Sequence, residues 1–245
     1  MAGLSHYQEF KELIDNYHMS ESGLKALQDV KLVIMVGASS TGRNTIIRQQ
    51  LETGRYHFIV SDTTRPPRVN DGVLEQNGRE YWFKTEEEML AELRKGELLE
   101  AELIHDQQVS GISIRELEKA IGENKIALAD LDLKGVHGIM NTKPDALAIM
   151  VVPPSFDEWQ RRLASRGRMA PDEMKRRLQT ASQIFEDGLK QDYYHYVISE
   201  NIEQSAAIID AVIDGKPNPH QGRAPGLIQH LQESLKQKLS TIDQI

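Results

Sequence analysis

The chain has 245 residues, of which 39% are hydrophobic and 6% aromatic, a composition that suits one globular core with aliphatic packing. Its formal net charge of -8 disfavours nucleic acid or an anionic membrane as a partner. The absence of cysteine excludes disulfides and thiolate metal sites, and no apolar run reaches the roughly 18 residues of a membrane span. We therefore expect a soluble, cytoplasmic protein.

The first 30 residues predict a helical extension, with Phe10, Leu13, Ile14 and Tyr17 on one face. In the domain that follows, short apolar runs alternate with helix signals. Such runs are typical of parallel strands buried on both faces, so the alternation predicts an α/β fold with a mostly parallel central sheet flanked by helices. The predicted strands are 32–36, 57–61, 126–132, 147–152 and 196–199.

Helix boundaries are predicted from capping residues and glycines. Three pairs have the spacing of a capping box at a helix start: Thr85 with Glu88, Ser113 with Glu116, and Ser155 with Glu158. Glycine after an apolar periodic run predicts a helix end. On that basis Gly54 ends a helix over 45–53, and Gly96 and Gly122 end the helices that begin near Thr85 and Ser113.

The stretch VGASSTGRNTII, residues 36–47, joins the first predicted strand to a helix. Gly37 and Gly42 match the glycines of G-x-x-x-x-G-K-[ST], a loop whose backbone N–H groups surround a polyphosphate. Arg43 replaces the lysine and keeps its charge, although its guanidinium is bulkier and planar. Asn44 replaces the hydroxyl that normally holds Mg²⁺, and it offers only an amide carbonyl or a water-mediated contact. Taken alone, the match is also compatible with an ordinary strand-to-helix turn.

Further motifs follow the second predicted strand. In VSDTTRPPR (60–68), Arg65 and Arg68 lie three apart on a proline-stiffened segment, and Tyr81 is near in NGREYWF (77–83). Such a group suits an oxyanion with several acceptors, although the arginines alone are also compatible with a solvated turn. The remaining motifs are GELLEAELIHDQQVSGIS (96–113), ADLDLKG (129–135) and the arginine-rich RRLASRGRMAPDEMKRRL (161–178).

The C-terminal segment, residues 217–245, reads as a Pro/Gly-rich linker and an amphipathic helix. We expect this helix and the N-terminal extension, residues 1–30, to dock on the core. The alternative is that the terminal helices form a homodimer or bind a partner.

Together, and in this order, the motifs resemble the guanylate kinase family, P-loop enzymes that move a phosphoryl group from ATP to GMP. The resemblance covers about residues 31 to 215. It comprises the loop, S-x-T-T-R-x-P-R, Y-x-F, G-E-[apolar]-[apolar]-E, D-[apolar]-D-x-x-G and the arginine-rich segment. It implies a P-loop NTPase domain over 31–216, with a small monophosphate-binding subdomain over 61–113 and an arginine-rich lid over 155–180.

The resemblance also implies roles for individual residues of the donor site. ATP would lie on the loop, and Mg²⁺ would be held near Asn44 and Asp130. Arg43 and three arginines of the lid, Arg162, Arg166 and Arg177, would offset charge on the transferring phosphoryl group. The residues implied to bind ATP are Gly37, Ala38, Ser39, Ser40, Thr41, Gly42, Arg43, Asn44 and Thr45.

For the acceptor, the resemblance implies that Arg65, Arg68 and Tyr81 bind the phosphate of the monophosphate. The groups implied to face guanine are Ser61, Glu100, Ser113 and Asp132. Carboxylates suit this role because guanine presents N1–H and N2–H₂ as donors, whereas an ionised carboxylate only accepts.

The segment 106–113 departs from the family pattern. Ser110 stands where the family has a phosphate-binding tyrosine, and Ile112 replaces a hydroxyl that contacts guanine, although Ser113 follows. The connection from Arg68 to Tyr81 is also longer than usual. A neutral hydrogen bond contributes only about 0.5–1.5 kcal/mol, so these losses do not by themselves abolish binding.

The leading hypothesis is therefore ATP-dependent phosphorylation of a nucleoside monophosphate, GMP to GDP. Two alternatives stay open: a binding module that has lost catalysis, suggested by the altered loop, and a phosphotransferase for another small phosphorylated substrate, suggested by 106–113. The arginines of the lid and both carboxylates of DLD (130–132) are retained, and this favours the enzyme, because a binding module has no need of the arginine clamp.

Overall fold

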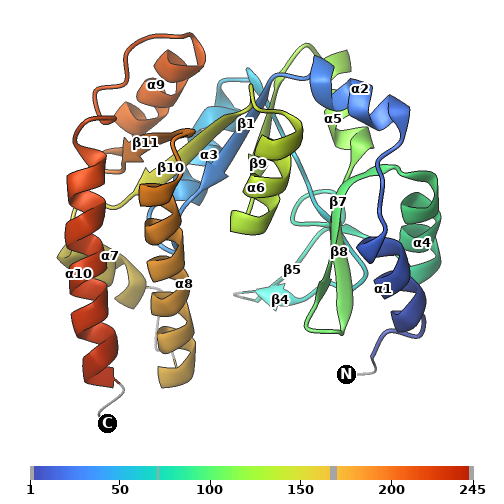
Figure 1. The fold of residues 1–245 in the computed structure, drawn as a ribbon, viewed down its shortest axis with the longest axis horizontal. Helices are drawn as coiled ribbons and strands as arrows, with labels where there is room; N and C mark the ends of the chain where they lie inside the picture. Colours follow the sequence, from blue (N-terminus) through green and yellow to red (C-terminus); the bar gives the residue numbers. More distant parts are fainter. Residues whose placement is uncertain (1–2, 71, 166–169, 243–245) are drawn as a thin grey trace. The chain divides into compact units, whose positions relative to one another are not determined.

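The computed structural model describes residues 3–70, 72–165 and 170–242, and within it the chain forms two compact units (Figure 1). The first unit comprises Met1–Leu32 and Tyr56–Ala129, and the second comprises Val33–Arg55 and Asp130–Ile245. The N-terminal extension thus belongs to the first unit, and the C-terminal helix belongs to the second.

A five-stranded sheet has the strand order β11-β10-β1-β9-β2. Its strands are β1 (Leu32–Val36), β2 (Tyr56–Phe58), β9 (Ile126–Asp130), β10 (Leu147–Val152) and β11 (Tyr194–Ile198). β10 pairs in parallel with β1 and with β11, and β2 pairs in parallel with β9. All five residues of β1 are buried, as expected for a strand covered on both faces. The predicted α/β fold with a mostly parallel sheet is confirmed.

Two of the predicted strands were too long. The second ends at Phe58 instead of residue 61, because the Val60 N–H donates to the buried carboxylate of Glu116 (3.3 Å) and leaves the ladder. The third ends at Asp130, because Asp132 turns out of the strand to cap the next helix. The last predicted strand begins earlier, at Tyr194.

The second unit carries the two longest helices of the described residues, α8 (Pro171–Lys190) and α10 (Ala224–Ile242). Its other helices are α3 (Arg43–Glu52), α6 (Leu133–Thr142), α7 (Phe156–Ala164) and α9 (Ile202–Ile213). α10 lies alongside α8 over much of its length (Figure 1) and buries Ile228, Leu231 and Leu235. The linker before α10 is fixed to β11, because the Ile198 N–H donates to His220 Nδ1 (3.0 Å).

The first unit contains a four-stranded sheet of order β6-β3-β8-β7, in which β7 and β8 form a hairpin. Its other elements are α1 (Tyr7–Asp15), α2 (Glu21–Asp29), β3 (Asp62–Thr63), β4 (Val69–Asn70), β5 (Val73–Leu74), β6 (Trp82–Phe83), α4 (Glu86–Lys95), β7 (Leu98–Ile104), β8 (Gln108–Ser113) and α5 (Ile114–Gly122). Phe10 of α1 is fully buried against Met89, Leu93 and Leu98. Both terminal helices thus bury their apolar faces within the chain.

The predicted N-cap residues are correct for all three helices, whereas the predicted capping boxes and terminal glycines are only partly correct. Thr85 and Glu88 form a complete capping box, and Gly96 ends α4 in the left-handed conformation. Ser113 and Ser155 cap α5 and α7, but the glutamate three residues on pairs with other side chains and does not reciprocate. α5 runs to Gly122, and Asn124 takes the left-handed φ of 52° expected of a glycine. None of the helices within the described residues is long and apolar enough to span a membrane.

Candidate functional site

The loop between β1 and α3 has a backbone that only glycine permits at two points. A Cβ on Gly37 would lie 2.8 Å from the carbonyl oxygen of Val151, and Gly42 has a φ of 99°. Gly42 is the N-cap residue of α3, which therefore begins two residues before the predicted Thr45. The loop thus brings its N–H groups and the helix N-terminus to one place, the arrangement that binds phosphate.

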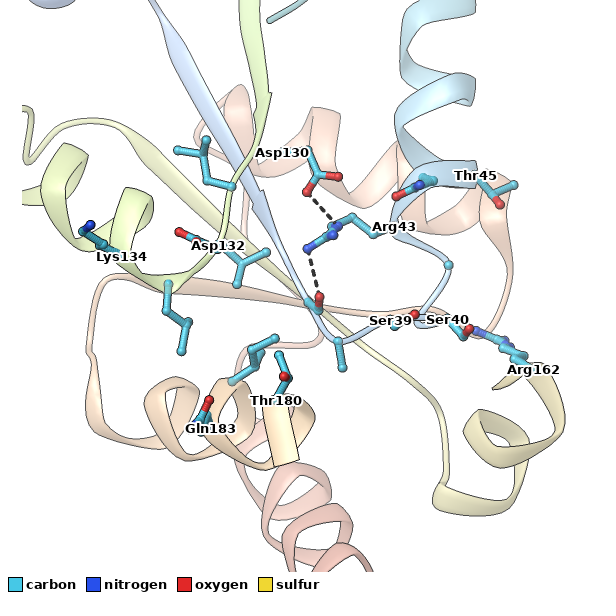
Figure 2. Close-up of a pocket in the computed structure, with 18 of the residues that line it drawn as sticks. Ser39, Ser40, Arg43, Thr45, Asp130, Asp132, Lys134, Arg162, Thr180 and Gln183 are labelled. Atoms are coloured by element: carbon cyan, nitrogen blue, oxygen red, sulfur yellow. Dashed lines mark hydrogen bonds and ion pairs between the residues drawn. The ribbon is translucent and has the colours of Figure 1, made fainter. Parts of the chain in front are cut away.

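A cavity of about 830 Å³ opens on this loop, within the second unit (Figure 2). Its size suits a nucleotide-sized ligand, for which pockets of about 300–1,000 Å³ are usual. All residues implied to bind ATP line it except Thr41, which is buried and bonds to the carbonyl of Ala38. Sequence reasoning missed Lys134, Thr180, Gln183 and Ile184, which also line it. The last three share one face of α8, but their residue types carry no phosphate-binding signal.

Arg43 is held at two points inside this cavity (Figure 2). Its Nη1 donates to the Gly37 carbonyl oxygen (2.8 Å), and its Nε lies 2.8 Å from Oδ1 of Asp130. The second contact is an ion pair without the alignment of a hydrogen bond, since Nε lacks a hydrogen-bond partner among the described residues. Burial raises the pKa of Asp130 above its ordinary value, and the charge of Arg43 works against that rise.

The loop also contains an unsatisfied hydroxyl. Ser40 has a φ of 66°, and its Oγ is buried without a hydrogen-bond partner in the described part of the chain. A buried hydroxyl without a partner is unfavourable, so the site has a polar group that a phosphate oxygen would satisfy.

Two arginines of the predicted lid donate hydrogen bonds to the loop. The guanidinium of Arg162 donates to the Thr41 carbonyl (3.2 Å) and to both Oγ and the carbonyl of Ser199 (2.9 Å each). Arg177 donates from Nη1 to Ser39 Oγ (3.0 Å). Arg166 lies outside the described residues. The action of these arginines on a transferring phosphoryl group stays a prediction.

The residues expected to hold Mg²⁺ do not fit a preformed metal site. Mg²⁺ binds carboxylate, phosphate and water oxygens in a nearly octahedral arrangement. Asp130 already faces the guanidinium of Arg43, and Asn44 is exposed and neutral. Asp132 caps α6, accepting from the Gly135 N–H (2.9 Å). Within the described residues, there is no group of three or more His, Cys, Asp or Glu side chains that could hold a metal ion.

The residues implied to bind the monophosphate phosphate lie in the first unit, where Arg65 is firmly fixed. Glu75 grips its guanidinium with two hydrogen bonds, of 2.5 and 3.0 Å, and the side chains are only 9% and 6% exposed. The guanidinium also lies over the Tyr81 ring, 4.7 Å from its centroid. Hydrogen bonding to Glu75 raises the pKa of Arg65 against the opposing effect of burial. Arg68 is exposed, and its backbone N–H donates to Glu75 (2.9 Å).

Sequence reasoning missed Glu75 as a member of this site. The only signal was its position, as an acidic residue between the two arginines and Tyr81. A lone glutamate in a long connection is more often solvated, so its pairing with Arg65 emerges only from the fold.

The groups implied to face guanine divide between the two units. Glu100 lies on β7 opposite Ile112 of β8, and Ser61 precedes β3 in the same unit. The Ser113 hydroxyl is buried and caps α5, accepting from the Arg115 N–H (3.3 Å). Ser110 donates its hydroxyl to the Asp62 carbonyl (3.0 Å). Both hydroxyls of the departing segment are thus engaged within the protein, and Asp132 belongs to the second unit.

Comparison with known proteins agrees with these features. The family model described as "Guanylate kinase" matches residues 29–215. The chain is 33% identical over 187 residues to the guanylate kinase of Corynebacterium efficiens, covering 76% of this chain and 95% of that protein. It is 38% identical over 153 residues to that of Nocardia farcinica, covering 62% and 77%. A solved guanylate kinase from Anaplasma phagocytophilum matches with a TM-score of 0.54 and 25% identity, over 76% of this chain and 85% of that one.

Proposed function

This chain belongs to the guanylate kinase family, and from that premise we propose that it transfers the γ-phosphoryl group of ATP to GMP, giving ADP and GDP. The observation that carries the proposal is the loop Gly37–Gly42, which leads into α3 beside a nucleotide-sized cavity. Membership of the family alone does not establish the activity of this chain, because a protein can keep its fold after losing the catalytic activity.

ATP is proposed as the occupant of the cavity. Its phosphates would meet the N–H groups of the loop, the positive end of α3 and the guanidinium of Arg43. The unpartnered Ser40 hydroxyl would gain a phosphate oxygen as its partner.

GMP is proposed to bind through residues of the first unit. Arg65 would receive the phosphate, and because Glu75 and Tyr81 already fix its guanidinium, little side-chain entropy is lost on binding. Glu100 would accept hydrogen bonds from guanine N1–H and N2–H₂.

The proposed reaction is an in-line displacement. A phosphate oxygen of GMP attacks the γ-phosphorus of ATP, the new P–O bond forms, and the bond from that phosphorus to the bridging oxygen of ADP breaks. The nucleophile is already ionised, so no general base is required, and positioning and charge compensation carry the rate. We assign the charge compensation to Arg43, Arg162, Arg166 and Arg177, and we expect 61–113 and 155–180 to close and exclude water.

One observation favours a catalytically impaired binding module instead. Arg43 is paired with Asp130, and the hydroxyl expected after it is absent. A module of this kind would bind GMP without phosphorylating it.

The test presents GMP, dGMP, AMP, UMP and CMP separately with Mg·ATP and follows ADP formation. We expect turnover with GMP and dGMP to exceed turnover with the others. Binding of GMP without turnover of any of the five would establish the binding module. Turnover restricted to a different monophosphate would overturn the assignment of guanine to Glu100.

A further inference from the structure

The contacts of Arg43 differ at its two ends. At the loop end, Nη1 makes a hydrogen bond to the Gly37 carbonyl (2.8 Å). At the other end, Nε faces Asp130 at 2.8 Å without hydrogen-bond alignment. Figure 2 shows the guanidinium between these two partners, at the wall of the cavity. The guanidinium is therefore hydrogen-bonded to the loop, and it forms an ion pair without an aligned hydrogen bond with the carboxylate.

The contact with Asp130 is replaceable by a phosphate. A guanidinium presents a planar fork of donors, and a phosphate offers it two oxygens in parallel hydrogen bonds. The Asp130 contact uses a single nitrogen that is not aligned with its acceptor. The side chains of the pair are 22% and 24% exposed and both residues line the cavity, so a ligand can reach the pair from the cavity, although the Nε atom itself is buried.

The usual route for fixing a metal is weakened at the same place. In loops that end in Lys-Ser or Lys-Thr, the hydroxyl holds Mg²⁺. Here Asn44 offers no hydroxyl, and Asp130 already has a cation beside it. Arg43 carries a guanidinium, so the positive charge of the loop is supplied by the chain itself.

We propose that, in this chain, Arg43 supplies the charge compensation that Mg²⁺ held by the loop supplies in the ordinary loop. When ATP binds, the guanidinium of Arg43 moves from Asp130 onto phosphate oxygens of ATP. Binding of the donor then depends little on Mg²⁺. This inference rests on the proposed function, because it takes ATP as the donor.

Calorimetry of ATP binding in the absence of GMP tests the inference. The measured quantity is the Kd of ATP in excess EDTA divided by its Kd in excess Mg²⁺. For the unmodified chain we expect this ratio to stay below about threefold, and for Arg43→Lys/Asn44→Thr, which restores the ordinary loop, to exceed about tenfold. A ratio above about threefold for the unmodified chain overturns the inference, whether or not the double variant folds.

A second variant tests the exchange between carboxylate and phosphate. In Asp130→Asn the competing charge is removed, and we expect ATP in EDTA to bind about threefold tighter or more. The matched control is Asp192→Asn, an exposed carboxylate between α8 and β11, which should leave the Kd unchanged. Weaker binding by Asp130→Asn would mean that Asp130 assists the donor and would contradict the exchange.

The outcomes separate this inference from the proposed function. If ATP binds in neither condition, the donor assignment of the proposed function fails. If ATP binds only with Mg²⁺ and GMP is turned over, the function stands and only the inference about Arg43 fails.

Discussion

Arg43 and Arg65 were both predicted to bind phosphate, and the two units hold them in opposite ways. Arg65 has two hydrogen bonds to Glu75 and an aromatic ring beneath it, so its position is set before any ligand arrives. Arg43 has one hydrogen bond to the loop and an unaligned ion pair with Asp130. A fixed cation favours recognition of one group in one place, whereas a loosely paired cation can move with a ligand.

The difference suits the two ligands of the proposed reaction. The monophosphate needs a defined orientation, because its oxygen must attack in line. The donor changes charge distribution during transfer, so a cation that can follow the phosphates is useful there.

Arg65→Ala is expected to have the largest effect on ligand binding. It removes a charged, preorganised partner of the phosphate and leaves Glu75 buried without its cation, so GMP binding should weaken by about 100-fold or more. ATP binding should change by less than about threefold. Calorimetry with each nucleotide separately measures both constants, and an equal loss of the two affinities would contradict the assignment of Arg65 to the acceptor.

Arg162→Ala is expected to destabilise the donor unit. The variant loses the bonds from Arg162 to Thr41 and Ser199, and we expect the free energy of unfolding to fall by about 2 kcal/mol. The matched control is Arg161→Ala, because the Arg161 side chain is 76% exposed and pairs only with Glu158 among the described residues. Urea unfolding compares the two variants, and equal losses would show that the contacts with the loop contribute nothing.

Glu75→Gln tests whether preorganisation of Arg65 matters. The guanidinium remains but loses its charged, two-oxygen partner, so GMP binding should weaken by about tenfold, less than for Arg65→Ala. Glu87→Gln on the exposed face of α4 serves as the control for loss of one carboxylate. Unchanged or tighter GMP binding in Glu75→Gln would show that Glu75 competes with the phosphate and does not position its partner.

The smallest effect concerns His220, which fixes the linker to β11. Burial, with the charge of Arg223 adding to it, lowers the pKa of His220 below its ordinary value. As the pH falls, this histidine is therefore protonated in the unfolded chain before it is protonated in the folded protein. The contribution of His220 to the free energy of unfolding is complete above about pH 6.5 and is lost as the pH falls toward the lowered pKa.

His220→Asn places an oxygen near the position of Nδ1, which accepts from Ile198, and removes the titration. We expect the free energy of unfolding of this variant to fall less between pH 8 and pH 5.5 than that of the unmodified chain. His230→Asn, at an 82% exposed position on α10, is the matched control for the loss of one histidine. An identical pH dependence in His220→Asn would contradict the buried, neutral role of His220.

The sequence predicted the architecture well because its signals are local. Strands such as 32–36 and 147–152 are continuous apolar runs, and the glycines of the loop are required by its backbone. Contacts between distant residues were not predictable. The pairing of Arg65 with Glu75 depends on how a long connection folds back, and the end of β2 depends on Glu116, 56 residues beyond Val60.

The roles of individual side chains were also only partly predictable. The family resemblance implied that Asp130 lies near the metal and the phosphates, but not that Arg43 would face it. Likewise, Ser113 was predicted both to cap a helix and to contact guanine, and its buried hydroxyl serves the cap. A polar residue type indicates what bonds are possible, whereas the neighbours that the fold provides decide which one forms.

The most direct measurement is phosphorus NMR of the protein with equal amounts of ATP and GMP in the presence of Mg²⁺. If Arg43 on the donor side and Arg65 on the acceptor side serve one reaction, ADP and GDP appear in equal amounts as ATP and GMP disappear. Arg65→Ala then slows the formation of both products together. An unchanged spectrum, under conditions where calorimetry shows both nucleotides bound, would contradict the account.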